Sequence, residues 1–429
     1  MFDVTLVNAP LSRRRDDWIA PPLGLLYVAA ALEAAQLGVK VIDANTSAHP
    51  VDDVVEAARA GGVVGFSSFT PNYPAAGRLA SAIRTRRPDL TLVLGGYHAT
   101  FAWREALAEG PFDAVVRGAG EATMTALAQT VRGGHRDHLA GVVWREEVAG
   151  DPGPPVRALD LVPRPARHLL DWSPYKRAGA SFAGSVQFSR GCRFHCYFCQ
   201  VHPMEGGWMA RDPEDTAAEV AEMRTSLGLE RFIFVDNLLT GDRETVLALC
   251  EALRRAAPGV HWSCDARVDG LDRELVREMH AAGCRSMFMG LESGAETTLR
   301  AIGKAKDVDY VMAQLRMVAD EGVNIVGSFV IGFPWEDETL IRRTIAFAAE
   351  APLSFVEFSF ATPLPGTRLA VEAEEQGAYV LVRDVTRWDG QTPVMVLPNL
   401  SRRRLVELYL EAIAAGYLKG VVDAKAEVI

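Results

Sequence analysis

The chain has 429 residues, a formal net charge of -10, and a composition that is 49% hydrophobic and 23% charged. These values suit a globular protein with two domains and a terminal segment, and they exclude a disordered or fibrous chain. The acidic charge argues against nucleic acid as a partner, since phosphate backbones are engaged by an excess of lysine and arginine.

The chain starts with MFDVTLVNAP, which lacks the basic, apolar and small-residue zones of a signal peptide. No apolar run reaches the roughly 20 residues that a bilayer crossing needs. We therefore predict a cytoplasmic protein without a membrane span, acting on a small molecule.

The region 1–140 alternates short β-branched runs with helical stretches. Buried parallel strands appear as continuous apolar runs, and helical crossovers between them produce an α/β sheet that is doubly wound in the manner of a Rossmann fold. The predicted strands are VTLVN, KVIDA, VVGFSS, TLVLGG and FDAVVRG.

Four of these strands are followed by glycine-rich or polar segments, at 8–10, 67–72, 95–100 and 117–121. In open α/β sheets ligands bind at the carboxyl ends of the strands. These four segments are therefore the predicted ligand-binding edge of the first domain.

The stretch 141–183 contains DPGPPV and LVPRPARHLL. Proline neither continues a helix nor fills a central strand. The stretch is predicted to be a linker between the two domains.

A second alternating series occupies 184–370. Its six βα units predict a partial barrel, in which the chemistry lies at the carboxyl ends of the strands. The predicted strands are SVQFSR, RFIFVD, VHWSCDAR, SMFMGLES, IVGSFVIG and FVEFSF.

Directly after the first of these strands, GCRFHCYFCQ places Cys192, Cys196 and Cys199 in one loop. Three thiolates can bind three irons of a 4Fe-4S cube and leave the fourth iron open to a ligand. The alternatives are a structural zinc site completed by His195 or His202, or core cysteines that bind nothing. The other three cysteines fall inside regular segments and are predicted to be core thiols.

The final stretch, 371–429, is predicted to be mostly helical because LSRRRLVELYLEAIAAGYL carries an amphipathic pattern. We expect it to roof the substrate pocket, with Tyr379, Trp388 and the turn at 361–367 as candidate substrate contacts. Core packing is an equally good explanation of both aromatic residues.

The spacing of the three cysteines at the end of the first barrel strand resembles the signature of the radical S-adenosylmethionine superfamily, over about 184–370. The resemblance implies that the open iron binds the amino and carboxylate groups of S-adenosylmethionine. It assigns further contacts by position: Phe198 near adenine, Asp236 at the methionine amino group, Arg267 at the methionine carboxylate, Glu292 at the ribose, and the stretch Gly327 to Gly332 beside adenine. The sequence FVDN around Asp236 departs from the Gly-Gly-Glu motif that the family often carries there.

The first domain resembles the cobalamin-binding domain that precedes the barrel in a large branch of this superfamily. PPLGLLYVAA, GGYHATF and VVRGAGEAT carry the resemblance. Glycines there let the backbone approach a flat macrocycle. The residues predicted to bind cobalamin are Asn8, Pro10, Ser67, Thr70, Asn72, Gly95, Gly96, Tyr97, His98, Gly118, Gly120 and Glu121.

The sequence departs from the cobalamin-dependent mutases and from methionine synthase, because it lacks the Asp-x-His-x-x-Gly motif that supplies a histidine to cobalt. His98 is preceded at two residues by Gly96 and is followed at three by Phe101. We predict that the lower face of cobalt is covered by a side chain of 67–72. A nucleotide-binding or purely structural Rossmann-like domain is the alternative, although no Gly-x-Gly-x-x-Gly follows the first strand.

The resemblance implies a methyltransferase that acts on an unactivated carbon of a small organic substrate. It implies three cofactors, a 4Fe-4S cluster, S-adenosyl-L-methionine and cobalamin, with a 5'-deoxyadenosyl radical removing hydrogen, methylcobalamin delivering the methyl group, and a flavodoxin- or ferredoxin-type electron donor. Within the same branch, the alternative is a cyclase, ring-contracting or oxidative enzyme without net methyl transfer. A non-catalytic corrinoid or metal sensor is the alternative from another class.

Overall fold

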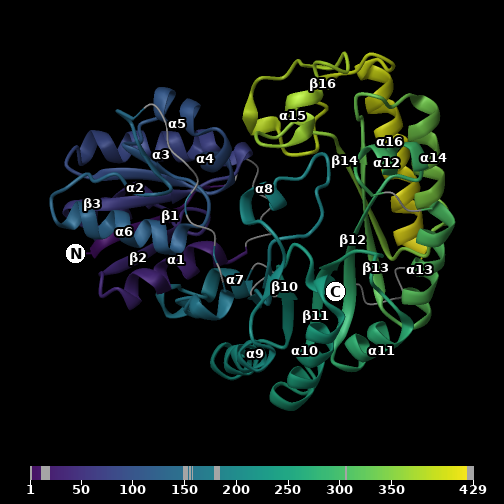
Figure 1. Cartoon of the computed structure of the whole chain (residues 1–429), viewed down its shortest axis with the longest axis horizontal. Helices are drawn as coiled ribbons and strands as arrows, with labels where there is room; N and C mark the ends of the chain where they lie inside the picture. The colour runs from purple at the N-terminus through teal and green to yellow at the C-terminus, as the bar shows by residue number, and fades with distance from the viewer. Residues whose placement is uncertain are drawn as a thin grey trace. The chain divides into compact units, whose positions relative to one another are not determined.

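The computed structural model forms two compact units, Met1–Ala183 and Gly184–Ile429 (Figure 1). No helix in the part of the chain that it describes is long and apolar enough to cross a membrane. The described residues are 2–10, 20–147, 153, 156, 158–177, 184–304 and 307–422.

The first unit contains a six-stranded sheet in the order β2-β1-β3-β4-β5-β6, parallel except for β6. The chain places β2 on one side of β1 and β3 on the other side, so the loops that follow β1 and β3 diverge. In open α/β sheets ligands bind at such a switch point. The strands are β1 (Phe2–Asn8), β2 (Val39–Asp43), β3 (Ala58–Ser67), β4 (Thr91–Gly95), β5 (Ala114–Val116) and β6 (Val142–Trp144).

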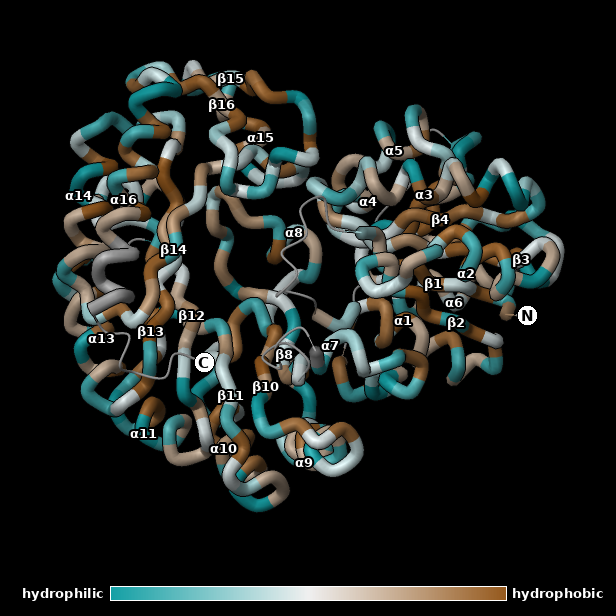
Figure 2. The backbone as a smooth tube through the Cα atoms, turned by 180° about the vertical axis from the view of Figure 1, so that it is seen from behind, coloured by the Kyte–Doolittle hydropathy of each residue, from teal (hydrophilic) through white to brown (hydrophobic). Residues whose placement is uncertain are grey.

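Helices cover both faces of this sheet, which confirms the predicted doubly wound fold. One hydrophobic core lies under α1 and α6, and a second lies under the helices of the opposite face. The strands are strongly hydrophobic in Figure 2, because each is buried on both faces. The helices are α1 (Leu23–Ala34), α2 (Pro50–Ala57), α3 (Tyr73–Arg86), α4 (Tyr97–Phe101), α5 (Trp103–Glu109) and α6 (Gly120–Arg132).

Strand β6 lies inside the stretch 141–183 that the proline content predicts as a linker. Its three residues are buried and pair antiparallel with β5. A three-residue apolar run carries too little pattern to be recognised beside several prolines. Most of the DPGPPV segment lies outside the described residues.

The second unit contains a parallel six-stranded sheet in the order β14-β13-β12-β11-β10-β7, as predicted for a partial barrel. Helices α9, α10, α11, α13 and α14 connect its strands. The strands are β7 (Ser185–Val186), β10 (Arg231–Phe234), β11 (His261–Ala266), β12 (Cys284–Glu292), β13 (Asn324–Ile331) and β14 (Phe355–Phe360).

The predicted strand SVQFSR is split in the structure. Only β7 joins the sheet, while β8 (Ser189–Arg190) pairs antiparallel with β9 (Met209–Ala210). The backbone N–H groups of Phe188 and Ser189 donate to the carboxylate of Asp236. The strand therefore leaves the sheet at the point where a side chain replaces its ladder partner.

Five helices of this unit begin at an aspartate. In each case the side chain accepts a backbone N–H of the first turn, a cap worth about 1 kcal/mol. The capping residues are Asp212 for α9 (Pro213–Leu227), Asp242 for α10 (Arg243–Ala256), Asp272 for α11 (Arg273–Ala281), Asp307 for α13 (Val308–Asp320) and Asp337 for α14 (Glu338–Glu350).

The last stretch is only partly helical. Helix α16 (Arg402–Val422) packs against β14 and α14, and Arg404 pairs with Glu338 at 2.8 Å. Before it, β15 (Tyr379–Val380) and β16 (Met395–Val396) form a short antiparallel pair. Two-residue strands carry no period that a sequence pattern could reveal.

Candidate functional site

The three cysteines of GCRFHCYFCQ lie in a loop of the second unit and are all partly exposed. Gly191 starts the loop at φ 78°, and a Cβ there would stand 2.3 Å from the Gly207 carbonyl oxygen. The backbone N–H of Cys192 donates to the Gly206 carbonyl at 3.1 Å, and that of Cys199 donates to the Cys196 carbonyl at 3.1 Å. The loop is therefore fixed by backbone hydrogen bonds, and its three cysteines are partly exposed.

The thiols are close enough to influence one another. Burial raises the pKa of the Cys199 thiol to about 11, and the neighbouring Cys196 and Cys192 thiols add to the effect. Burial also raises the pKa of Cys192. The thiols with raised pKa values hold their protons near pH 7, and binding of a metal releases these protons.

Among the described residues, no three His, Cys, Asp or Glu side chains are grouped as ligands of one metal ion. The donor set fits a cube better than a single ion, because the three thiolates then bind three different irons and stand further apart. Nδ1 of His202 lies 2.7 Å from the Cys192 carbonyl oxygen, so this nitrogen is engaged by the backbone. Cys250, Cys264 and Cys284 are buried, as core thiols should be.

Arg267 follows β11 and reaches the cysteine loop. Its Nη1 lies 3.5 Å from Sγ of Cys196, and its guanidinium carbon lies 3.8 Å from the centre of the Phe194 ring. Its Nε and Nη2 both donate to Oδ2 of Asp269, at 2.9 and 2.7 Å. The predicted contact of Arg267 with the methionine carboxylate remains a prediction, and one edge of the guanidinium is already occupied by Asp269.

Glu292 lies at the end of β12 in a left-handed conformation, with φ 64°. The register of β12 against β13 shifts between Gly290 and Glu292, and this irregularity turns the carboxylate. Nζ of Lys304 donates to the Glu292 carboxylate at 2.7 Å and to the Gly290 carbonyl at 2.6 Å. Both charged side chains are about nine-tenths buried. The predicted ribose-contacting acid is therefore held in one position by a buried cation.

Asp236 ends up fully buried rather than at an open edge. Burial raises its pKa to about 7, against the lowering effect of the Phe188 and Ser189 hydrogen bonds. Its role at the methionine amino group remains a prediction. In the structure its carboxylate accepts backbone hydrogen bonds at the junction of β7 and β8.

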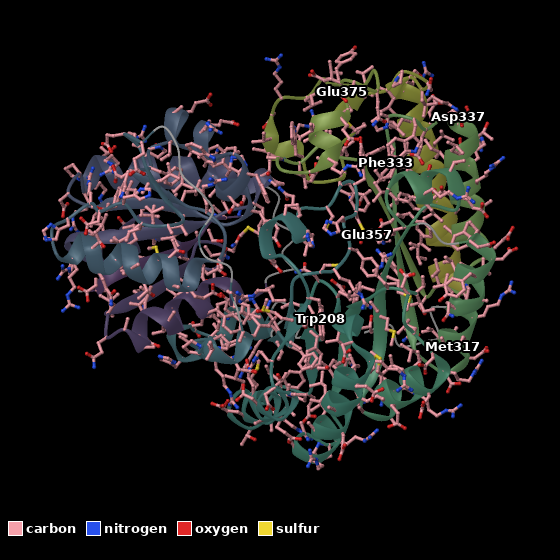
Figure 3. The ribbon with its side chains drawn as sticks, in the orientation of Figure 1. Trp208, Met317, Phe333, Asp337, Glu357 and Glu375 are labelled. Atoms are coloured by element: carbon pink, nitrogen blue, oxygen red, sulfur yellow. The ribbon has the colours of Figure 1, made fainter. Side chains whose placement is uncertain are left out.

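An aromatic group stands beside the cysteine loop. The ring of Phe198, predicted to lie near adenine, is 5.8 Å from Phe333, which stacks on Trp335 at 5.1 Å. Phe333 is labelled in Figure 3. Gly332 has φ 89° and donates its N–H to Glu336 at 2.8 Å. Gly327 is packed differently, since a Cβ there would stand 2.7 Å from the Leu353 side chain. The predicted place of Gly327 beside adenine stays a prediction.

In the first unit the predicted cobalamin-binding residues gather along one edge of the sheet. They follow β1, β3, β4 and β5, whose neighbours are hydrogen-bonded in the order β1-β3-β4-β5. Asn72 fixes the loop after β3, because its amide accepts the Phe69 N–H at 2.7 Å and donates to the Ala9 carbonyl at 3.2 Å. The residues at this edge are Asn8, Pro10, Ser67, Thr70, Asn72, Gly95, Gly96, Tyr97, His98, Gly118, Gly120 and Glu121.

The centre of this edge combines a strained glycine with a buried imidazole. Gly96 has φ 94°, and a Cβ there would stand 2.6 Å from the Ser68 carbonyl oxygen. Nδ1 of His98 lies 3.3 Å from the Thr70 hydroxyl, and the ring stacks on Tyr73 at 4.1 Å. Burial lowers the pKa of His98 to about 4, so the ring is neutral near pH 7.

The edge suits a large ligand that is flat and carries amide groups. Phe69 is 56% exposed and stacks on Tyr97 at 5.5 Å, so an apolar surface faces outward. The buried Ser68 hydroxyl and Nε2 of His98 have no hydrogen-bond partner among the described residues. Buried polar atoms are rarely left without a partner, and a bound corrinoid would supply one.

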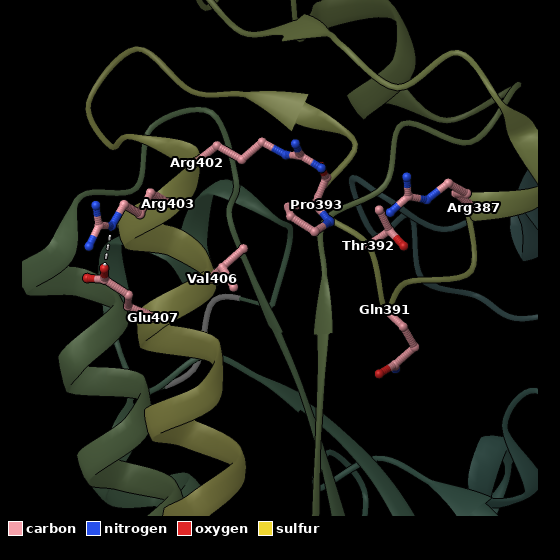
Figure 4. Close-up of a pocket in the computed structure, with 8 residues that line it drawn as sticks. All are labelled: Arg387, Gln391, Thr392, Pro393, Arg402, Arg403, Val406 and Glu407. Carbon is pink, nitrogen blue, oxygen red and sulfur yellow. Dashed lines mark hydrogen bonds and ion pairs between the residues drawn. The ribbon is translucent and has the colours of Figure 1, made fainter.

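A pocket of 520 Å³ in the second unit holds none of these residues (Figure 4). Arg402 donates to the Pro393 carbonyl at 3.1 Å, and Arg403 pairs with Glu407 at 3.0 Å. The pocket is lined by Arg387, Gln391, Thr392, Pro393, Arg402, Arg403, Val406 and Glu407. Trp388 donates to the Val382 carbonyl at 2.8 Å and Tyr379 is 53% exposed, and the role of both as substrate contacts stays a prediction.

Sequence reasoning missed four residues beside the predicted site: Phe194, Asp269, Lys304 and Phe333. Phe194 and Asp269 were close in sequence to residues already singled out, and a Lys twelve positions after Glu292 gives no spacing signal. Only the fold brings Lys304 back to the end of β12.

Two family models match the chain. The B12 binding domain matches residues 17–128, and the radical SAM superfamily matches residues 186–348. An uncharacterized methyltransferase of Pyrococcus horikoshii is 28% identical over 94% of this chain and 89% of its own length. An anaerobic magnesium-protoporphyrin IX monomethyl ester cyclase of Rubrivivax gelatinosus is 27% identical over 90% of this chain and 72% of its own length.

The fold is shared with the radical S-adenosylmethionine methyltransferase TsrM from Kitasatospora setae, solved with cobalamin and a [4Fe-4S] cluster bound. The TM-score is 0.77 at 16% identity, over 97% of this chain and 89% of that one. The two matched domains imply cobalamin for the first unit, and a 4Fe-4S cluster with S-adenosylmethionine for the second. The chain therefore belongs to the cobalamin-dependent radical S-adenosylmethionine enzymes.

Proposed function

We propose that the chain is a methyltransferase that methylates an unactivated carbon of a small organic substrate. The observation that carries the proposal is the loop that groups Cys192, Cys196 and Cys199 in a chain with a B12 binding domain. Relatives named as methyltransferases support it, among them a hopanoid C-3 methylase of Methylococcus capsulatus, 28% identical over 91% of this chain.

When bound, the cluster supplies one electron for the cleavage of S-adenosylmethionine, and cobalamin supplies a carrier for the methyl group. The three thiolates would hold the cluster, and its remaining iron would be open to the amino and carboxylate groups of S-adenosylmethionine. Glu292, oriented by Lys304, accepts hydrogen bonds from the ribose. Phe198 would lie against adenine and, with Phe333 beside it, would keep water away.

The first unit binds cobalamin through backbone and neutral groups. Gly96 and Gly118 would let the backbone approach a bound cobalamin, and the loop 67–72 would help to hold it. His98 is stacked on Tyr73 and does not coordinate the metal in this proposal. Reduced Co(II) cobalamin bound to the chain should then show no nitrogen superhyperfine splitting in its electron paramagnetic resonance spectrum.

Product counting with methyl-deuterated S-adenosylmethionine tests the proposal, with a flavodoxin- or ferredoxin-type protein as electron donor. S-adenosylhomocysteine, 5'-deoxyadenosine and deuterated product should appear in near equal amounts. Formation of 5'-deoxyadenosine without S-adenosylhomocysteine and without label in the product would contradict methyl transfer. A cyclase or rearrangement would then take its place, a second candidate favoured by the likeness to the magnesium-protoporphyrin cyclases.

A further inference from the structure

The guanidinium of Arg267 lies against a thiol of the cysteine loop. The side chain is 11% exposed, and three contacts fix its plane. Asp269 takes Nε and Nη2, the Phe194 ring covers one face, and Nη1 points to Sγ of Cys196 at 3.5 Å. A buried, always protonated group is thus held against one of the predicted cluster ligands.

This arrangement leaves fewer donors of Arg267 for a carboxylate. Arginine frequently binds a carboxylate through two parallel N–H groups of one edge. In Arg267 the edge formed by Nε and Nη2 already faces Asp269. The neighbouring Nη1 is directed at sulfur rather than at free space.

A cation beside a cluster sulfur has a defined electrostatic consequence. Reduction adds one negative charge to a 4Fe-4S cluster, and a hydrogen bond or positive charge at a ligating sulfur stabilises the reduced form more than the oxidised form. The low exposure of Arg267 limits screening by solvent. Asp269 offsets part of the charge, but it leaves the N–H to Cys196 in place.

We propose that Arg267 is a positioning residue that raises the reduction potential of the cluster by donating its Nη1 hydrogen to Sγ of Cys196, with Asp269 and Phe194 holding it in place. The inference rests on the proposed binding of the cluster by the three cysteines. The electron comes from a low-potential one-electron donor, for which dithionite serves in the test, and no bond to Arg267 forms or breaks.

The test is a redox titration of the full-length holoprotein, followed by electron paramagnetic resonance. Arg267→Met should lower the midpoint potential, so that the ratio of reduced to oxidised cluster at a fixed potential falls about tenfold, or about 59 mV for one electron. Arg267→Lys keeps the charge but loses the fixed fork and should fall between wild type and Arg267→Met. Asp269→Asn removes the carboxylate that orients the guanidinium of Arg267 but keeps the cation. It should therefore change the midpoint potential by less than Arg267→Met does.

Arg243→Met is the matched control. It removes an arginine paired with Asp272 and Glu274 between two outer helices, away from any cysteine contact, and should leave the potential unchanged. The affinity for S-adenosylmethionine is measured in parallel by equilibrium dialysis. An unchanged potential in Arg267→Met together with a weakened affinity would overturn the inference and return Arg267 to the methionine carboxylate.

Iron content separates the failure of this inference from failure of its premise. If wild-type protein assembles no 4Fe-4S cluster, the proposed function itself fails. If wild type and Arg243→Met hold four irons, whereas Arg267→Met and Arg267→Lys both hold none, Arg267 is required for assembly and the tuning role is wrong.

Discussion

The two candidate sites of this chain are formed by different kinds of residue. In the first unit the edge of the sheet presents glycines, hydroxyls, an exposed aromatic ring and a neutral histidine. In the second unit the cysteine loop is surrounded by Arg267, Lys304 and Glu292, all charged and largely buried. A large ligand with many amides is matched by shape and backbone, whereas a charged cluster and a zwitterionic ligand are matched by fixed charges.

The comparison predicts that removing single side chains breaks the second site more severely than the first. The largest effect is expected at the thiols. Cys192→Ala, Cys196→Ala and Cys199→Ala should each abolish the cluster, because three irons need three protein ligands. Iron and sulfide analysis after anaerobic reconstitution measures this.

Cys250→Ala is the control for the thiol series, because Cys250 is fully buried in α10 and lies outside the loop. It should keep about four irons and four sulfides. Stoichiometric zinc in the native protein, or equal iron in all four variants, would show that the loop does not hold a cluster.

The next largest effect is expected at the buried pair of Glu292 and Lys304. Lys304→Met leaves a buried carboxylate without its cation, which should lower the free energy of unfolding by about 3 to 5 kcal/mol. It should also weaken S-adenosylmethionine binding, since Glu292 loses its fixed position. Chemical denaturation and equilibrium dialysis measure the two effects.

The double variant Glu292→Gln/Lys304→Met is the control for stability. It removes both charges and should recover part of the lost unfolding free energy without recovering the affinity. If Lys304→Met binds S-adenosylmethionine as tightly as wild type does, Glu292 does not contact this ligand.

The first unit should respond to pH through His98. Its folded-state pKa of about 4 lies below the ordinary value of 6.5, so the unfolded chain takes up a proton before the folded chain does. Stability is therefore complete above about pH 6.5 and falls by about 3 kcal/mol as the pH drops to about 4. The change is measured as the urea midpoint of the first unit at each pH, with unfolding of this unit detected by the proteolytic fragments that it yields.

His98→Gln removes the titrating group while keeping a polar side chain. Its urea midpoint should be lower near pH 7 and should fall less steeply between pH 6.5 and 4. A slope identical to that of wild type would mean that other groups control the acid response.

The smallest effect is expected from backbone changes in the first unit. Gly96→Ala forces a Cβ to within 2.6 Å of the Ser68 carbonyl at φ 94° and should cost about 1 to 3 kcal/mol. Gly77→Ala, in α3 with nothing within 4 Å of the added carbon, should stabilise the unit by about 0.4 to 1 kcal/mol. Corrinoid affinity should fall only in the Gly96 variant.

The fold was readable from the sequence wherever a strand was long and buried, and unreadable where it was short. The nine strands of the two large sheets that have four or more residues lie in segments rich in apolar residues, whereas β6, β15 and β16 have two or three residues and no period. The cysteine loop was predictable because its chemistry is local in sequence. Lys304 was not, since its importance depends on Glu292, a partner that only the folded chain brings within 3 Å.

The central claim is that each unit holds its own cofactor through its own kind of chemistry. Co-quantification of iron and cobalt in full-length Cys196→Ala and Gly96→Val, reconstituted side by side with wild type, tests it most directly. Cys196→Ala should lose the iron and keep the cobalt, and Gly96→Val should lose the cobalt and keep the iron. Loss of both metals from both variants, or retention of cobalt in Gly96→Val at the wild-type level, would contradict the account.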